Sequence, residues 1–128
     1  MNSDNEWSLN RIALGVFAPI LILVGVLGFV IPTNVGMTSG ATPYNVFHLI
    51  FGVLGIFLVL SKSESLIRAF CIGFGAIDLY QAVASYLHLF PEQYLHWTRV
   101  DDVLHIVVGL ALVLIGIAPG LRAQRQAS

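Results

Sequence analysis

The stretch that decides the fold is NVFHLIFG, residues 45–52, which opens one of four apolar segments in the chain. Residues 102–109, DVLHIVVG, repeat its spacing: a small polar residue, a His three positions on, and a Gly four beyond that. A helix places residues i, i+3 and i+7 on one face. Each stretch therefore predicts a helix with one face that carries a small polar side chain, an imidazole and a glycine.

The composition around these stretches indicates a lipid environment. Hydrophobic residues make up 57% of the 128 residues and charged residues 10%, whereas soluble domains average about 25% charged residues. The net charge is −1 and the six basic residues are scattered, which excludes a patch that tracks nucleic-acid phosphates. Cys71 is the one cysteine, so no intramolecular disulfide can form.

Four segments are apolar enough to cross a bilayer, at about 12–31, 44–60, 66–90 and 101–118. They predict an all-α, integral membrane four-helix transmembrane bundle over residues 11–119, with a polar leader at 1–10. The last helix is expected to end at Pro119-Gly120, which leaves 120–128 as a polar tail. Ser63 or Ser65 is expected to cap the third helix. A soluble bundle is disfavoured because no segment has a broad polar face.

The basic residues predict the orientation. Four spans place the two termini and the 61–65 connection on one side of the membrane. That side collects five of the six basic residues, and the other side has Arg99. By the positive-inside rule both termini are cytoplasmic. The five are Arg11, Lys62, Arg68, Arg122 and Arg125. A cleaved leader is not expected, because Asp4 and Glu6 make the N-terminus acidic.

Orientation and helix rise together predict a polar cluster in the outer half of the bundle. Asp78 lies deeper, close to the midplane, with no basic residue at its depth. It is expected to be protonated, hydrogen-bonded or wetted through the cluster. An ionisable residue inside a membrane is a functional hypothesis by default. The expected cluster is Asn45, His48, Gln81, Ser85, His88, Asp102 and His105.

Three interpretations of this cluster stay open. In the structural one, the two His make hydrogen bonds, Asn45 and Asp102 cap helix starts, and glycines pack helices together. These packing glycines are Gly52, Gly55, Gly75 and Gly109. In the second, His48 and His105 flank a haem or bind a chlorophyll, or hold a divalent metal such as Zn²⁺ or Cu²⁺ with Asp102. In the third, His48, His105 and Asp78 form a ladder that handles protons or small solutes.

The two motifs resemble a bacterial membrane-protein family, domain of unknown function 4383. The resemblance covers roughly residues 10–118. It implies an integral membrane protein with four spans and no assigned activity, in a bacterial plasma or internal membrane. The matching positions are Asn45, His48, Gly52 and Gly55 in the first motif, and Asp101, Leu104 and His105 in the second.

No catalytic residue is predicted, because the chain lacks a nucleophile elbow, a phosphate-binding loop and a Cys-x-x-Cys pair. The expected function is that of a small non-catalytic membrane protein, a structural or accessory subunit of a membrane assembly. Its expected partners are the lipid bilayer, itself or other membrane proteins, and no nucleic acid. Cofactor binding through His48 and His105, and solute handling through the cluster, are the alternatives.

Overall fold

Five helices make up the part of the chain that the computed structural model describes, residues 8–32 and 35–127. Four of them are long and apolar enough to cross a membrane, α5 over its residues Arg99–Ala118. This confirms the predicted all-α architecture of four long apolar helices. The helices are α1 (Leu9–Val30), α2 (Thr42–Ser61), α3 (Glu64–Leu87), α4 (Glu92–Leu95) and α5 (Arg99–Ala127).

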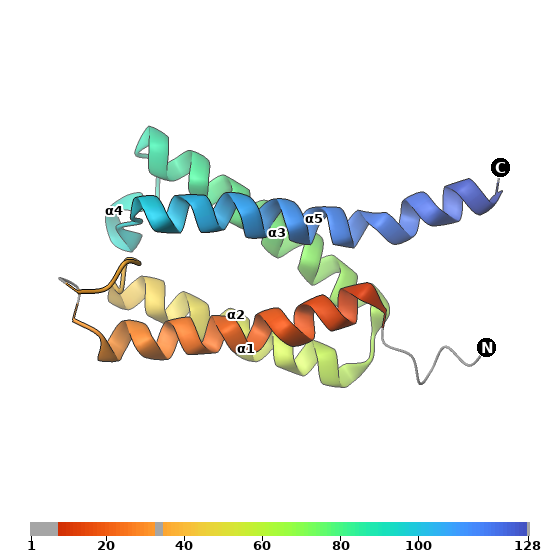
Figure 1. Cartoon of the computed structure of the whole chain (residues 1–128), viewed down its shortest axis with the longest axis horizontal. Helices are drawn as coiled ribbons and strands as arrows, with labels where there is room; N and C mark the ends of the chain where they lie inside the picture. The colour runs from red at the N-terminus through yellow and green to blue at the C-terminus, as the bar shows by residue number, and fades with distance from the viewer. Residues whose placement is uncertain (1–7, 33–34, 128) are drawn as a thin grey trace.

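The long helices form two antiparallel pairs (Figure 1). α1 packs mainly against α2, and α3 packs mainly against α5. At one end of the bundle, called the α4 end here, the α1–α2 loop lies near α4 and the start of α5 (Figure 1). At the other, called the turn end, residues 62 and 63 connect α2 to α3. Helix starts at the α4 end therefore come from α2 and α5, which carry the two repeated motifs.

Glycines bring the helices of each pair into close contact. A Cβ atom at Gly109 would lie 2.9 Å from the carbonyl oxygen of Gly75, and one at Gly75 would lie 2.8 Å from the carbonyl oxygen of Gly109. A Cβ atom at Gly52 would lie 2.9 Å from the backbone nitrogen of Ile22 on α1, and Gly55 also faces α1. All four glycines expected to pack helices lie at such contacts, which small residues allow.

The interior between the two ends is filled by phenylalanine rings. Five of them form a continuous group, called the Phe cluster here: Phe17, Phe47, Phe51, Phe70 and Phe74. Phe70 and Phe74 stack with ring centroids 5.4 Å apart, and Phe51 lies 5.1 Å from Phe74. Aliphatic side chains of α1, α3 and α5 surround the rings. The middle of the bundle is therefore apolar and filled.

Polar contacts at the turn end secure the helix termini. Ser63 accepts a hydrogen bond from Leu66 N and caps α3, as the sequence predicts. Ser8 caps α1, and its hydroxyl donates to the Glu64 carboxylate. Arg11 Nε donates to the carbonyl oxygen of Val59, 3.1 Å away, near the end of α2. The starts of α1 and α3 are thereby held against the end of α2.

Some helix boundaries differ from those predicted. α3 ends at Leu87, three residues early, because His88 takes a left-handed conformation with φ 55° and its N–H bonds to Ala84 O. A short helix, α4, forms inside the segment predicted as a loop. The α5 backbone continues through Pro119-Gly120 to Ala127, where an end at 118 was predicted. A proline deletes one main-chain hydrogen bond, and here the bonds on either side carry the helix past it.

Candidate functional site

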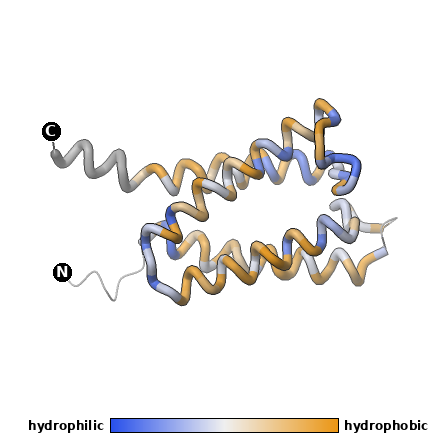
Figure 2. Tube along the Cα trace, turned by 180° about the vertical axis from the view of Figure 1, so that it is seen from behind, coloured by the Kyte–Doolittle hydropathy of each residue, from blue (hydrophilic) through white to orange (hydrophobic). Residues whose placement is uncertain are grey.

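Polar side chains from three helices lie buried in the half of the bundle that is nearer the α4 end. Each is at most 8% exposed. Hydrophilic positions gather at this end and continue into the helices (Figure 2). Burying polar groups costs free energy unless they find partners, so their contacts decide what this region does. The members, called the buried polar cluster here, are Tyr44 and His48 of α2, Asp78 and Gln81 of α3, and Asp101, Asp102 and His105 of α5.

Asp101 connects α5 to the other helix pair. Its Oδ1 accepts a hydrogen bond from the Tyr44 hydroxyl at 2.7 Å. Its Oδ2 accepts from the backbone N–H of Ser39 and of Thr98, each at 2.9 Å. Thr98 Oγ1 accepts in return from Asp101 N at 3.2 Å, which completes a capping box at the start of α5. One carboxylate therefore caps α5 and holds both the α1–α2 loop and α2.

The two imidazoles lie at the same end of the bundle. His48 Nδ1 is 2.8 Å from the Tyr44 carbonyl oxygen, and the two rings are 4.2 Å apart. Because a carbonyl oxygen can only accept, Nδ1 donates, and a neutral His48 keeps Nε2 as its acceptor. His105 meets the Trp97 ring edge-to-face at 6.0 Å. His105 is also within electrostatic reach of His48, Asp101 and Asp102.

Asn45 lies apart from this cluster. Its Nδ2 donates to Gly40 O at 2.8 Å, and its Oδ1 occupies the place of a Gly28 side chain, 1.8 Å from where a Cβ would be. Asn45 therefore serves the contact with α1. Ser85 is half-buried. His88 is exposed at the end of α3, so the prediction that it belongs to the cluster is wrong.

The caps predicted at Asn45 and Asp102 are wrong. Ala41 is the N-cap of α2, and Thr98 caps α5. Both predicted caps lie further inside their helices. Thr42 and Pro43 start α2 early, since proline is tolerated in a first turn where its missing N–H has no partner to lose. The capping box likewise starts α5 ahead of Asp102.

Two important residues were missed as candidates. Asp101 has a local signal, because Thr98-x-x-Asp101 is a capping-box pattern. Tyr44 has none, because its partner lies 57 residues away in the chain. Only the packing of α2 near the start of α5 gives Tyr44 its role.

Three buried atoms of the cluster receive no hydrogen bond from the described residues. They are Gln81 Oε1, Asp102 Oδ1 and His105 Nδ1. Their side chains are 4%, 4% and 7% exposed. Buried polar atoms are nearly always paired with protein, ordered water or a ligand. These three atoms therefore keep hydrogen-bonding capacity that no described residue uses.

The geometry does not favour a metal centre. In residues 8–32 and 35–127, no three His, Cys, Asp or Glu side chains are grouped so that they could hold a metal ion. The three-ligand site predicted from His48, His105 and Asp102 is therefore not formed. Ligation of a haem or a chlorophyll by the two His stays a prediction.

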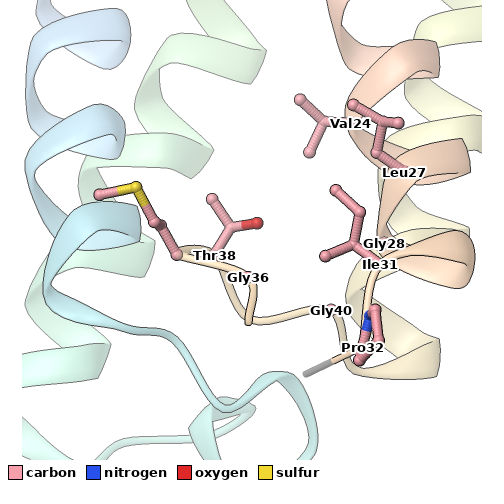
Figure 3. Close-up of a pocket in the computed structure, with 9 residues that line it drawn as sticks. Val24, Leu27, Gly28, Ile31, Pro32, Gly36, Thr38 and Gly40 are labelled. Carbon is pink, nitrogen blue, oxygen red and sulfur yellow. The ribbon is translucent and has the colours of Figure 1, made fainter. Parts of the chain in front are cut away.

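A separate cavity of about 220 Å³ lies between the end of α1 and the α1–α2 loop. Val24 and Leu27 of α1, with Ile31 just after its end, lie on one side of it and Thr38 on the other (Figure 3). Its lining is mostly apolar and includes no member of the buried polar cluster.

No protein family model, curated protein or solved structure matches this chain. The resemblance to domain of unknown function 4383 stays a prediction that rests on the two motifs. The buried polar cluster and its surroundings are therefore the features that bear on function.

Proposed function

We propose that the protein is a non-catalytic multi-pass membrane protein that binds small polar solutes in the buried polar cluster. The observation that carries the proposal is the set of unpartnered atoms, Gln81 Oε1, Asp102 Oδ1 and His105 Nδ1. Leaving a buried polar atom unpaired costs about 1–3 kcal/mol. Water or a small solute that reaches these atoms removes that cost.

The Phe cluster supports binding rather than conduction. Phe74 lies one helical turn before Asp78 on α3 and contacts Phe17, Phe47, Phe51 and Phe70. A proton or solute path needs polar groups or water along its length. The polar residues buried toward the turn end, Asn10 and Arg11, lie at the start of α1 and do not belong to the cluster, so solutes enter and leave at the α4 end.

This proposal predicts that a cysteine in place of Gln81 is reached from water. In Gln81→Cys the thiol is expected to react with a small charged methanethiosulfonate reagent added at the α4 side of reconstituted protein. Native Cys71 provides an internal control, because it is fully buried beside the Phe cluster. Mass spectrometry after digestion measures the modification at each position.

The expected result is clear labelling at position 81 with Cys71 unmodified. If Gln81→Cys were as unreactive as Cys71 in the folded protein, solutes would not reach the cluster and the proposed function would be wrong. Ser85→Cys, at a half-buried position one turn further along α3, should react at least as fast.

We also propose that the protein lies in a bacterial plasma or internal membrane with both termini in the cytoplasm. The positive-inside rule supports this orientation, since Lys62 and Arg68 lie toward the turn end, and Arg99 lies at the α4 end. The two membrane-protein motifs support the bacterial membrane.

The orientation predicts opposite labelling at the two ends of the bundle. Gln93→Cys should react with an impermeant thiol reagent added to intact cells, and Lys62→Cys should react only after the cells are opened. Both positions are exposed, so access to the reagent is the variable. The reverse pattern would place the termini outside.

The accessory-subunit function expected from composition stays a prediction. The glycines on which it depended, Gly52, Gly55, Gly75 and Gly109, pack the chain's own helices together. Gly73 differs, because no atom lies within 4 Å of where its Cβ would be. Such a small exposed residue leaves room for a helix of another membrane protein.

A further inference from the structure

We propose that the solute bound by the buried polar cluster is a small protonated nitrogen compound, of which ammonium is the simplest. This inference rests on the proposed function and names its ligand class. It follows from three properties of the cluster: what its unpartnered atoms can do, what charge it carries, and which aromatic rings lie beside its histidines.

The unpartnered atoms are mainly acceptors. Gln81 Oε1 and Asp102 Oδ1 can only accept hydrogen bonds unless the acid is protonated, and His105 Nδ1 can accept in one tautomer. A fourth unpartnered atom at the α4 end, Asn45 Oδ1, lies against Gly28. A ligand that satisfies the cluster therefore needs several N–H or O–H donors.

The cluster also lacks a positive charge. Asp101 has its donors from Tyr44, Ser39 and Thr98. Asp78 and Asp102 are 3% and 4% exposed, and no ion pair is formed with either in the part of the chain described. Among the side chains that the structure describes, the basic one that is buried is Arg11, and its Nε donates to Val59 O at the turn end.

Arg99 does not supply that charge either. It is exposed, and its Nη1 lies 3.4 Å from the Tyr86 hydroxyl, outside the cluster. The other titratable groups that face the cluster are His48, His105 and Tyr44, none of which has a fixed positive charge. A carboxylate buried in a membrane needs a proton or a cation beside it.

The acidic and imidazole groups are not arranged as a metal site. A metal ion needs its ligands grouped around one point, and no such group of three is present in the described residues. Oxygen atoms and a neutral imidazole nitrogen are instead the acceptors that the N–H groups of a protonated nitrogen compound need. The buried rings of Trp97 and Tyr44, beside His105 and His48, add faces that attract a cation.

The test measures thermal stability of the purified protein in mild detergent at fixed pH and ionic strength. Ammonium and methylammonium chloride are titrated against sodium, potassium and tetramethylammonium chloride, the last a cation with no donor. Ammonium and methylammonium are expected to raise the melting temperature saturably, with half-saturation about tenfold or more below that of the other salts. Equal effects of all five salts would overturn the proposal.

Substitutions inside and outside the buried polar cluster test whether ammonium binds there. Asp102→Asn should weaken ammonium binding about tenfold or more, because it removes the charge and keeps the shape. Gln81→Glu should strengthen it, because it adds a negative charge. Glu92→Gln, a carboxylate-to-amide change at the same end but outside the cluster, should leave it unchanged. The opposite sign for Gln81→Glu in a folded protein would overturn the ligand class.

The two proposals fail differently. If ammonium has no effect while Gln81→Cys is still labelled from water, the cluster binds another kind of solute, and this inference is wrong while the proposed function stands. If Gln81→Cys is also unreactive, both are wrong.

Discussion

Asp101→Ala is expected to destabilise the protein by about 3–5 kcal/mol. The substitution leaves the Tyr44 hydroxyl and the backbone N–H groups of Ser39 and Thr98 without their acceptor. Each buried donor without a partner costs about 1–3 kcal/mol. The capping box of α5 is lost as well, at about 1 kcal/mol. Reversible unfolding by SDS in mixed micelles, followed by far-UV circular dichroism, measures the loss.

Tyr44→Phe is the matched variant for this prediction. It removes one donor to the Asp101 carboxylate and leaves the cap, so the expected loss is about 1 kcal/mol. In the double variant the two losses should not add, because the tyrosine hydroxyl has no acceptor left once Asp101 is replaced. A loss for Asp101→Ala no larger than that for Tyr44→Phe would show that the carboxylate does not connect the two helix pairs.

Gly109→Ala is expected to reduce the free energy of unfolding by about 1–3 kcal/mol, the usual cost of overpacking. The new methyl group would lie 2.9 Å from the carbonyl oxygen of Gly75, 3.0 Å from Leu79 Cγ and 3.1 Å from Asp78 Cβ. Backbone atoms of a packed helix cannot move aside as the end of a flexible side chain can. The α3–α5 pair must separate to admit it.

Gly73→Ala is the control, since it makes the same change on α3 where no atom lies within 4 Å. It should cause no loss, and a gain of up to about 1 kcal/mol is expected from the better helix propensity of alanine. Equal losses at Gly109 and Gly73 would mean that the cost comes from the helix itself and not from the crossing of α3 and α5.

Much of the fold could be predicted from the sequence, because it follows from local patterns. Four apolar segments separated by polar turns predict four long helices whatever their neighbours are. Ser63 was predicted as a possible cap for the same reason, since an N-cap depends on the next few residues. The end of α3 was not predicted, because the left-handed conformation of His88 has no strong signature in a residue other than glycine.

The sequence also identified most members of the buried polar cluster. Polar residues within apolar helices must face other helices, so His48, Asp78, Gln81, Asp102 and His105 were predicted to lie inside the bundle. They are all buried at the α4 end or one turn deeper. Their individual partners could not be predicted, because contacts between residues far apart in the chain depend on how the helices cross.

Asn45 and Asp101 show the difference between what the sequence determines and what only the tertiary structure decides. By itself the sequence determined the number of long helices, their apolar character and the position of each polar residue along its helix, because helix period and rise are local and fixed. The tertiary structure decided that Asn45 faces Gly28 of α1, and that Asp101 joins Tyr44, Ser39 and Thr98. Those outcomes depend on which glycines meet across each helix pair, and that choice is made by the packing of the whole bundle.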